Sequence, residues 1–86
     1  MYKVELSRDA KRFFERASAT LQRRLDRCFD KLKVEPHSDG GIKPLKGDFA
    51  GYYRYRVGDY RVIYRIDDQQ QSVFVLKIAH RSDVYE

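Results

Sequence analysis

The alternation of apolar and polar residues predicts a short strand at the amino end, followed by two helices. Tyr2, Val4 and Leu6 alternate with charged neighbours, as in a strand with one buried face. Ser7 and Ser18 are good N-cap residues. Each precedes apolar residues at helical spacing, namely Ala10, Phe13, Phe14 and Ala17, then Leu21, Leu25, Cys28, Phe29 and Leu32. The two amphipathic segments therefore predict a helical hairpin that Pro36 ends.

The second half of the chain predicts an antiparallel meander. Aromatic or aliphatic residues alternate with mostly basic ones in segments 52–57 and 60–66. In segment 72–78, Phe74, Leu76 and Ile78 alternate with Val73, Val75 and Lys77. Gly58 and Asp59 fit a two-residue hairpin turn, and the polar segment 67–71 fits a second loop. Residues 37–41 fit a loop, and 42–47, which Pro44 interrupts, fit irregular backbone.

The order of these elements is strand, helix, helix, strand, strand, strand. It predicts a single α+β domain over residues 1–86. We expect a two-helix hairpin packed on one face of a four-stranded, mainly antiparallel sheet, because short links favour pairing of neighbouring strands. The pattern leaves the pairing of the first strand open.

Composition narrows the class of protein. The 86 residues carry a net charge of +5, and 36% of them are charged. Cys28 is the only cysteine, which excludes an intrachain disulfide. The sequence begins without the apolar core of a signal peptide, and no apolar run reaches membrane-spanning length. We therefore expect a cytoplasmic protein without a membrane partner, and no cofactor or metal.

The strand register predicts a cationic sheet face. A two-residue turn at Gly58 and Asp59 places Arg56 opposite Arg61, and cross-strand partners share a face. If 67–71 form the next loop, Lys77 lies opposite Arg61 and completes a row. Arg54 and Arg65 have the same parity.

Such a row points to a polyanionic ligand. Like charges directly opposite each other are unfavourable in a sheet, whereas a bound polyanion turns that cost into attraction. Arginine also suits phosphate, because its planar fork binds two oxygens at once. The alternative is a solvated face whose long side chains splay apart.

The carboxyl end carries candidate acid–base groups. His80, Arg81 and Tyr85 lie within a few positions of one another. Cleavage of RNA through its 2′-hydroxyl needs a base, cations at the transition state and an acid for the leaving oxygen. His80 has a suitable ordinary pKa, and cations beside Tyr85 favour its phenolate. A histidine after a strand also commonly has a structural role, and the choice of base between His80 and Tyr85 stays open.

Three runs of sequence together resemble the RelE/ParE toxin superfamily. They are residues 43–47 (KPLKG), 53–64 (YRYRVGDYRVIY) and 80–85 (HRSDVY). The strand and helical hairpin before them fit as well, so the resemblance covers nearly the whole chain. It implies a toxin of a bacterial toxin–antitoxin pair, with the ribosome, mRNA and a RelB-like antitoxin as partners. The activity it implies is metal-independent cleavage of mRNA in the ribosomal A site, which inhibits translation.

The resemblance also implies roles for particular residues. Catalysis would rest on Arg61, Arg81, Tyr85 and His80. RNA binding would involve Arg54 and Arg56, and the matching run 43–47 adds Lys43 and Lys46. The strand register, rather than the resemblance, adds Arg65 and Lys77 to this set. Two other functions remain open, namely a ParE-type DNA gyrase inhibitor on the same fold and a non-catalytic module that binds nucleic acid or protein. The residues Arg61, Arg81 and Tyr85 favour the nuclease.

Overall fold

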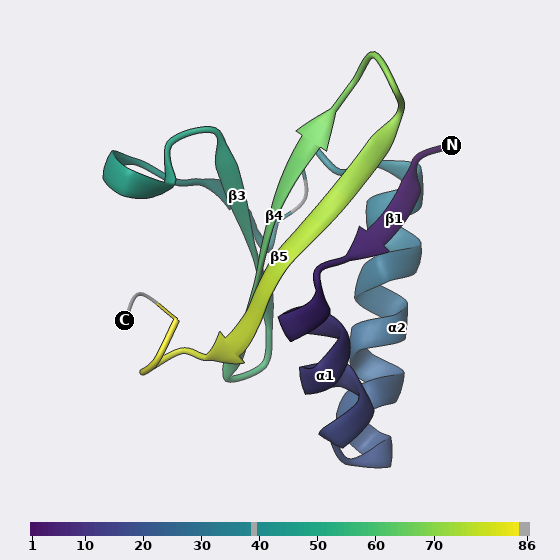
Figure 1. Cartoon of the computed structure of the whole chain (residues 1–86), viewed down its shortest axis with the longest axis vertical. Coiled ribbons are helices and arrows are strands. Elements are labelled where there is room, and N and C mark those ends of the chain that lie inside the picture. Colours follow the sequence, from purple (N-terminus) through teal and green to yellow (C-terminus); the bar gives the residue numbers. More distant parts are fainter. Residues whose placement is uncertain (39, 85–86) are drawn as a thin grey trace.

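The computed structural model describes residues 1–38 and 40–84 (Figure 1). Its elements follow the order β1, α1, α2, β2, a short 3-10 helix η1, β3, β4 and β5. Their bounds are Lys3–Leu6, Arg8–Arg16, Ala19–Val34, Ile42–Pro44, Gly47–Phe49, Tyr52–Val57, Tyr60–Asp67 and Ser72–His80.

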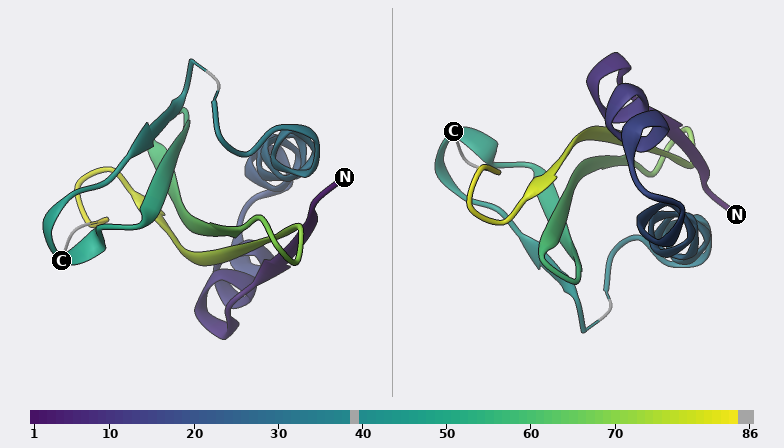
Figure 2. Two further views of the ribbon diagram at one scale, coloured as in Figure 1. Left: turned by 90° about the horizontal axis from the view of Figure 1, so that it is seen from above. Right: turned by 90° about the horizontal axis from the view of Figure 1, so that it is seen from below.

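Both helices begin where the sequence predicts. The Ser7 hydroxyl accepts the Ala10 N–H at 3.0 Å, and the Ser18 hydroxyl accepts the Leu21 N–H at 3.1 Å. These bonds satisfy backbone donors that have no partner inside the helix. The predicted hairpin of two amphipathic helices is confirmed, and it covers one face of the sheet (Figure 2).

The α+β class is confirmed, but the sheet has five strands rather than four. The strand order is β1-β5-β4-β3-β2, and β1 pairs parallel to β5, which settles the pairing left open by the sequence. The added strand is β2, in the segment expected to be irregular; it pairs with residues 53–55 of β3. Pro44 fits there because an edge strand tolerates a residue that has no N–H to donate.

The main core lies between the sheet and the helices. Tyr64, Leu25 and Leu32 are fully buried in it, and Cys28 is buried as its helical position predicts. The Tyr64 hydroxyl donates to the Pro36 carbonyl at 2.8 Å, so this phenol has a partner inside the core. The segment after α2 is thereby tied to the middle of β4.

The predicted register of β4 and β5 is wrong. β4 extends to Asp67, which pairs with Ser72 and shifts the register by one residue, and a β-bulge between Ile63 and Tyr64 leaves Leu76 without an opposite residue and adds a second shift. Lys77 therefore faces Ile63, and Arg61 faces Ala79. Before the bulge, Val73 and Val75 point into the main core, and Phe74 faces Arg65 on the other side of the sheet.

A second, smaller apolar cluster lies on the sheet face away from the helices, called the outer face below. Its buried members are Ile63, Ala79 and Val84. Val84 follows β5 and is only 1% exposed, so the tail folds back against the sheet. Four half-buried residues complete the cluster: Leu45, Phe49, Tyr52 and Leu76.

Candidate functional site

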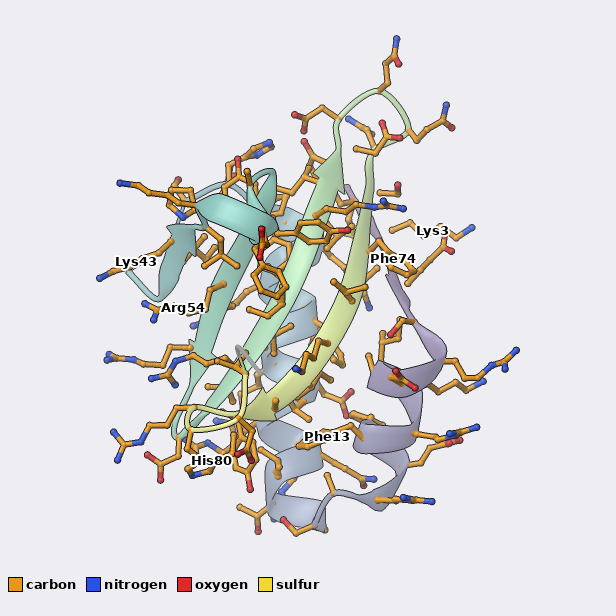
Figure 3. All side chains as sticks on the ribbon, turned by 60° about the vertical axis from the view of Figure 1, so that its left-hand side comes forward. Lys3, Phe13, Lys43, Arg54, Phe74 and His80 are labelled. Carbon is orange, nitrogen blue, oxygen red and sulfur yellow. The ribbon has the colours of Figure 1, made fainter. Side chains whose placement is uncertain are left out.

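Basic side chains follow neighbouring strands across the outer face. The pairing places Lys43 opposite Arg54, Arg54 opposite Ile63, and Ile63 opposite Lys77. Figure 3 shows Lys43 and Arg54 on adjacent strands. In the next row Arg56 faces Arg61, as the hairpin turn predicts. The cationic face exists, but Lys77 belongs to the row of Arg54 and not to that of Arg61.

The β3–β4 turn brings two candidate catalytic arginines together. The Arg61 guanidinium donates to the carbonyls of Gly58, at 3.0 Å, and Tyr60, at 2.9 Å. The backbone N–H of Arg81 donates to the carbonyl of Asp59 at 2.8 Å. Residues far apart in sequence thus meet at one turn, with Arg56 on the same face.

The turn itself requires glycine at position 58. Gly58 has a φ of +59°, in the left-handed region that glycine adopts without strain. A Cβ at this position would also lie 2.8 Å from Nη2 of Arg24, which reaches over from α2. The turn is therefore bounded by Arg24 from the helix and by Arg61 from the outer face.

The guanidinium of Arg54 has one N–H group without a hydrogen-bond partner among the described residues. The residue is half-buried, and its Nε is shielded from solvent with no hydrogen-bond partner among the described residues. A shielded donor without an acceptor is costly, and a phosphate oxygen on the outer face would satisfy it. Lys43, directly opposite on β2, is exposed and adds a second charge.

His80 lies apart from the paired arginines. It pairs with Tyr60 across the strands, and the two rings meet edge to face at 5.5 Å. The Tyr60 ring in turn contacts Phe13 of α1, so this pair belongs to the helix side of the sheet. The Nδ1 of His80 accepts the N–H of Ser82 at 3.2 Å. The same nitrogen lies 2.8 Å from the Ser82 hydroxyl, so the ring is tied to the start of the tail.

The other predicted residues are distributed along the same face. Arg65 is exposed, and its guanidinium carbon lies 4.9 Å from the centroid of the Phe74 ring. Lys46 is exposed just before η1.

Tyr85 falls outside the described residues. Sequence reasoning missed Phe74 and Val84, because the bulge and the returning tail carry no local signal.

A polar cluster that the sequence did not reveal joins the amino end of the chain and the β4–β5 loop to the loop after α2. Asp68 accepts the Tyr2 hydroxyl at 2.7 Å and lies 2.8 Å from Nε2 of His37, which also contacts Glu35. The bond to Asp68 raises the pKa of His37, and the bond from Tyr2 lowers the pKa of Asp68. Hydrogen bonds from His37 lower the pKa of Glu35, and the bond to Asp68 raises the pKa of Tyr2 to about 12.

Within residues 1–38 and 40–84, no group of three or more histidine, cysteine or carboxylate side chains is arranged to hold a metal ion. No helix in the same part of the chain is long and apolar enough to cross a membrane.

The chain belongs to the ParE/RelE family of toxins from type II toxin–antitoxin systems. The family model described as the ParE toxin of type II toxin–antitoxin system, parDE, matches residues 4–85. The chain is 39% identical to toxin RelE of Mycobacterium tuberculosis over 79 residues, covering 92% of this chain and 76% of the relative. It is 43% identical to toxin RelG of the same organism over 58 residues, covering 67% of this chain and 64% of RelG.

Solved structures show the same fold. The toxin–antitoxin complex RelBE2 of M. tuberculosis contains a chain that matches with a TM-score of 0.79 and 32% identity, over 93% of this chain and 98% of the other. The archaeal RelE–RelB complex of Pyrococcus horikoshii matches with a TM-score of 0.82 and 27% identity, over 96% and 98%. The protein is therefore a toxin of a type II toxin–antitoxin system.

Proposed function

We propose that this toxin is a ribosome-dependent endoribonuclease that cleaves mRNA in the ribosomal A site. The observation that carries the proposal is the meeting of Arg61 and Arg81 at the β3–β4 turn, beside the cationic row of Lys43, Arg54 and Lys77. The two arginines supply fixed positive charge for a reacting phosphate. The row offers a path for the neighbouring phosphates of a single strand.

The proposed reaction is attack of a ribose 2′-oxygen on the adjacent phosphorus. The bond to the 5′-oxygen breaks, which leaves a 2′,3′-cyclic phosphate on one product and a 5′-hydroxyl on the other. Charge develops on the phosphate oxygens as the new bond forms, and Arg61 and Arg81 stabilise it. The carbonyl bonds of Arg61 hold its guanidinium in place before the substrate arrives. These steps use the protein's own side chains and assign no role to a metal ion.

Two proton transfers complete the reaction. A base takes the proton of the 2′-hydroxyl, and an acid gives a proton to the leaving 5′-oxygen. Because Nδ1 of His80 accepts from Ser82, this nitrogen already has a donor. We therefore assign His80 the task of holding the turn that carries Arg81, and we assign the base to Tyr85. The Arg81 cation, close in sequence, favours the Tyr85 phenolate.

A RelB-like antitoxin is the proposed protein partner. The two solved complexes named above contain toxins bound to their antitoxins. The net charge of +5 favours an antitoxin segment that is acidic or amphipathic. Because exposed charges are screened by salt, the complex should weaken as ionic strength rises.

Inhibition of DNA gyrase is the second candidate, because the family model that matches is that of the ParE toxin. Expression of the toxin in growing cells distinguishes the two functions. With radiolabelled precursors, a nuclease acting on the ribosome stops protein synthesis first and leaves cut messages, which primer extension maps. A gyrase inhibitor stops DNA synthesis first and relaxes plasmid supercoiling. The second pattern, with intact messages, overturns the proposal.

Arg81→Ala and Tyr85→Phe should each abolish the arrest of protein synthesis. Both changes lie among the last six positions of the sequence, and Arg81 lies outside the main core. Thermal unfolding of each purified variant serves as the control for folding. Full toxicity of either variant at equal expression contradicts the assignment of that residue.

A further inference from the structure

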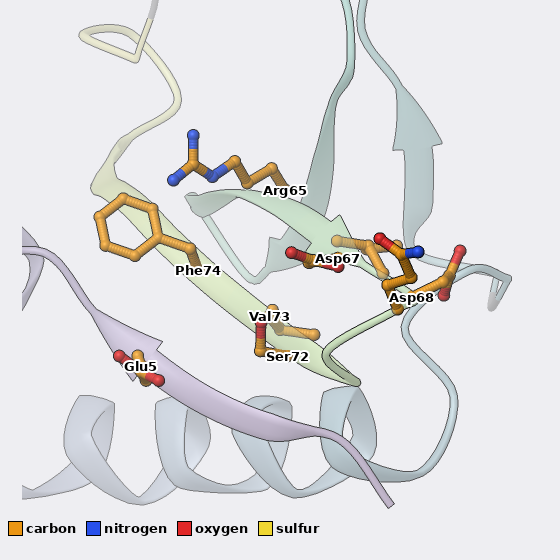
Figure 4. Close-up of a pocket in the computed structure, with 9 residues that line it drawn as sticks. Glu5, Arg65, Asp67, Asp68, Ser72, Val73 and Phe74 are labelled. Carbon is orange, nitrogen blue, oxygen red and sulfur yellow. The ribbon is translucent and has the colours of Figure 1, made fainter.

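A shallow groove lies on the outer face, at the end of β4 and β5 opposite the Gly58 turn (Figure 4). Arg65 and Phe74 form its floor, Glu5 and Asp67 lie beside them on the same face, and Asp68 of the loop after β4 is also part of the lining. We infer that this groove is a stacking subsite for one RNA base, preferably a purine, on the same strand that the toxin cleaves. The inference rests on the proposed function and extends it to a second position along the RNA.

The floor of the groove is a preformed stacking surface. Arg65 faces Phe74 across β4 and β5, and its guanidinium carbon lies 4.9 Å from the ring centroid. In the same row across the sheet, Tyr52 of β3 lies opposite Arg65, and Glu5 of β1 lies beside Phe74. Phe74 is half-buried and faces Arg65 because the ladder of β4 and β5 starts from the pair of Asp67 and Ser72. Both an aromatic ring and a guanidinium plane stack on nucleobases.

The charge of the lining selects a base over a phosphate. Two carboxylates of the outer face, those of Glu5 and Asp67, line the groove, and the one cation on its floor is Arg65. A phosphate would be repelled by this lining, whereas a neutral base fits the apolar floor and meets hydrogen-bond acceptors at its edge. A purine stacks over more area than a pyrimidine, which gives the preference.

The groove lies in line with the proposed site of cleavage. Arg61 and Arg65 belong to one strand and lie four residues apart, which corresponds to about 13 Å along β4. An extended RNA strand covers that length in a few nucleotides. Arg54 and Lys77 occupy the row in between, where they would meet the intervening phosphates. One strand can thus present a phosphate to Arg61 and a base to Phe74.

The test measures binding of short 2′-O-methyl RNA, which has no nucleophilic 2′-hydroxyl and is therefore not cut. Fluorescence anisotropy at low salt gives Kd for the intact oligonucleotide and for a series with one abasic residue at each position in turn. For the wild type, an abasic residue at one position should raise Kd about tenfold or more. Phe74→Leu should bind the intact RNA about tenfold more weakly and should not respond to the abasic residue.

Two further variants make the test specific. Arg65→Lys keeps the charge but loses the planar group, so it should resemble Phe74→Leu. Phe14→Leu makes the same change on the helix side of the sheet, where Phe14 packs on Phe29, and it should retain the wild-type pattern. Undetectable binding, equal Kd values along the abasic series for the wild type, or an unchanged pattern in Phe74→Leu overturns the inference.

The outcome is separable from that of the proposed function. Cleavage of mRNA on ribosomes is measured in parallel on the same preparations. If the toxin cleaves mRNA but its Kd values are equal along the abasic series, the stacking subsite is contradicted and the proposed nuclease function is not. If one abasic position raises Kd but no mRNA is cleaved, the stacking subsite is supported and the proposed nuclease function is contradicted.

Discussion

Replacing Arg61 with glutamine separates the stability of the fold from the proposed chemistry. Arg61 faces Arg56 across the hairpin and donates to the carbonyls of Gly58 and Tyr60. Glutamine removes the positive charge but keeps a polar side chain whose amide can donate one of those bonds. The two consequences for stability therefore have opposite signs.

The magnitudes nearly cancel. Removing one of two facing like charges stabilises the sheet by about 0.2 to 1 kcal/mol. Losing one hydrogen bond costs about 0.5 to 1.5 kcal/mol, and the lower end applies because both bonds lie at or near the surface. The free energy of unfolding should therefore change by less than about 1 kcal/mol, which is several degrees in Tm for a domain of this size. Loss of a fixed cation at the transition state should slow cleavage about 100-fold or more.

Thermal unfolding at low and high salt, together with single-turnover cleavage on ribosomes, measures both quantities. Arg8→Gln, at an exposed arginine of α1, is the matched control and should change neither. The stabilising part of the Arg61→Gln effect should shrink as salt rises, since screening already relieves the repulsion. A loss of more than about 3 kcal/mol would make Arg61 a structural residue. An unchanged cleavage rate would remove it from the proposed site.

Two more predictions follow from buried and titrating groups. Val84→Ala should destabilise the docking of the tail by about 1 to 2 kcal/mol, because Val84 is only 1% exposed. Hydrogen exchange at the Arg81 amide, which donates to the Asp59 carbonyl, should become faster. An unchanged exchange rate would show that Val84 does not hold the tail against the sheet. His37→Gln should lower Tm most near about pH 5 to 6, where His37 is protonated and its carboxylate partners are ionised. This difference should fade as pH rises through the raised pKa of His37, and again as pH falls through the lowered pKa of Asp68. A difference independent of pH would show that the ion pair is not its source.

Elements fixed by local chemistry are predictable from the sequence. The serine caps, the apolar stripes of the helices and the Gly58 turn each follow from neighbouring residues, and the facing of Arg56 and Arg61 follows from that turn. These signals determine the fold class and the half of the cationic face closest to the turn.

The remainder depends on contacts between distant segments. A bulge adds one residue to β5 and leaves the alternation before it unchanged. Because apolar residues such as Phe74 and Leu76 also lie on the outer face, the pattern of hydrophobicity does not reveal the change in strand register. The pairing of Asp68 with Tyr2 spans 66 positions of sequence. The return of Val84 to the sheet likewise depends on a cluster that exists only in the folded state.

The central claim, that this toxin cuts mRNA through the ribose 2′-hydroxyl, is tested most directly on programmed ribosomes. The purified toxin is mixed with ribosomes that hold a defined message with an empty A site, and the products are analysed by length and end group. A second message carries 2′-deoxyribose at the position of cleavage. We predict a cut in the first message that leaves a 2′,3′-cyclic phosphate or its 3′-phosphate product, and no cut in the second. An uncut first message, or equal cleavage of both, would contradict the claim.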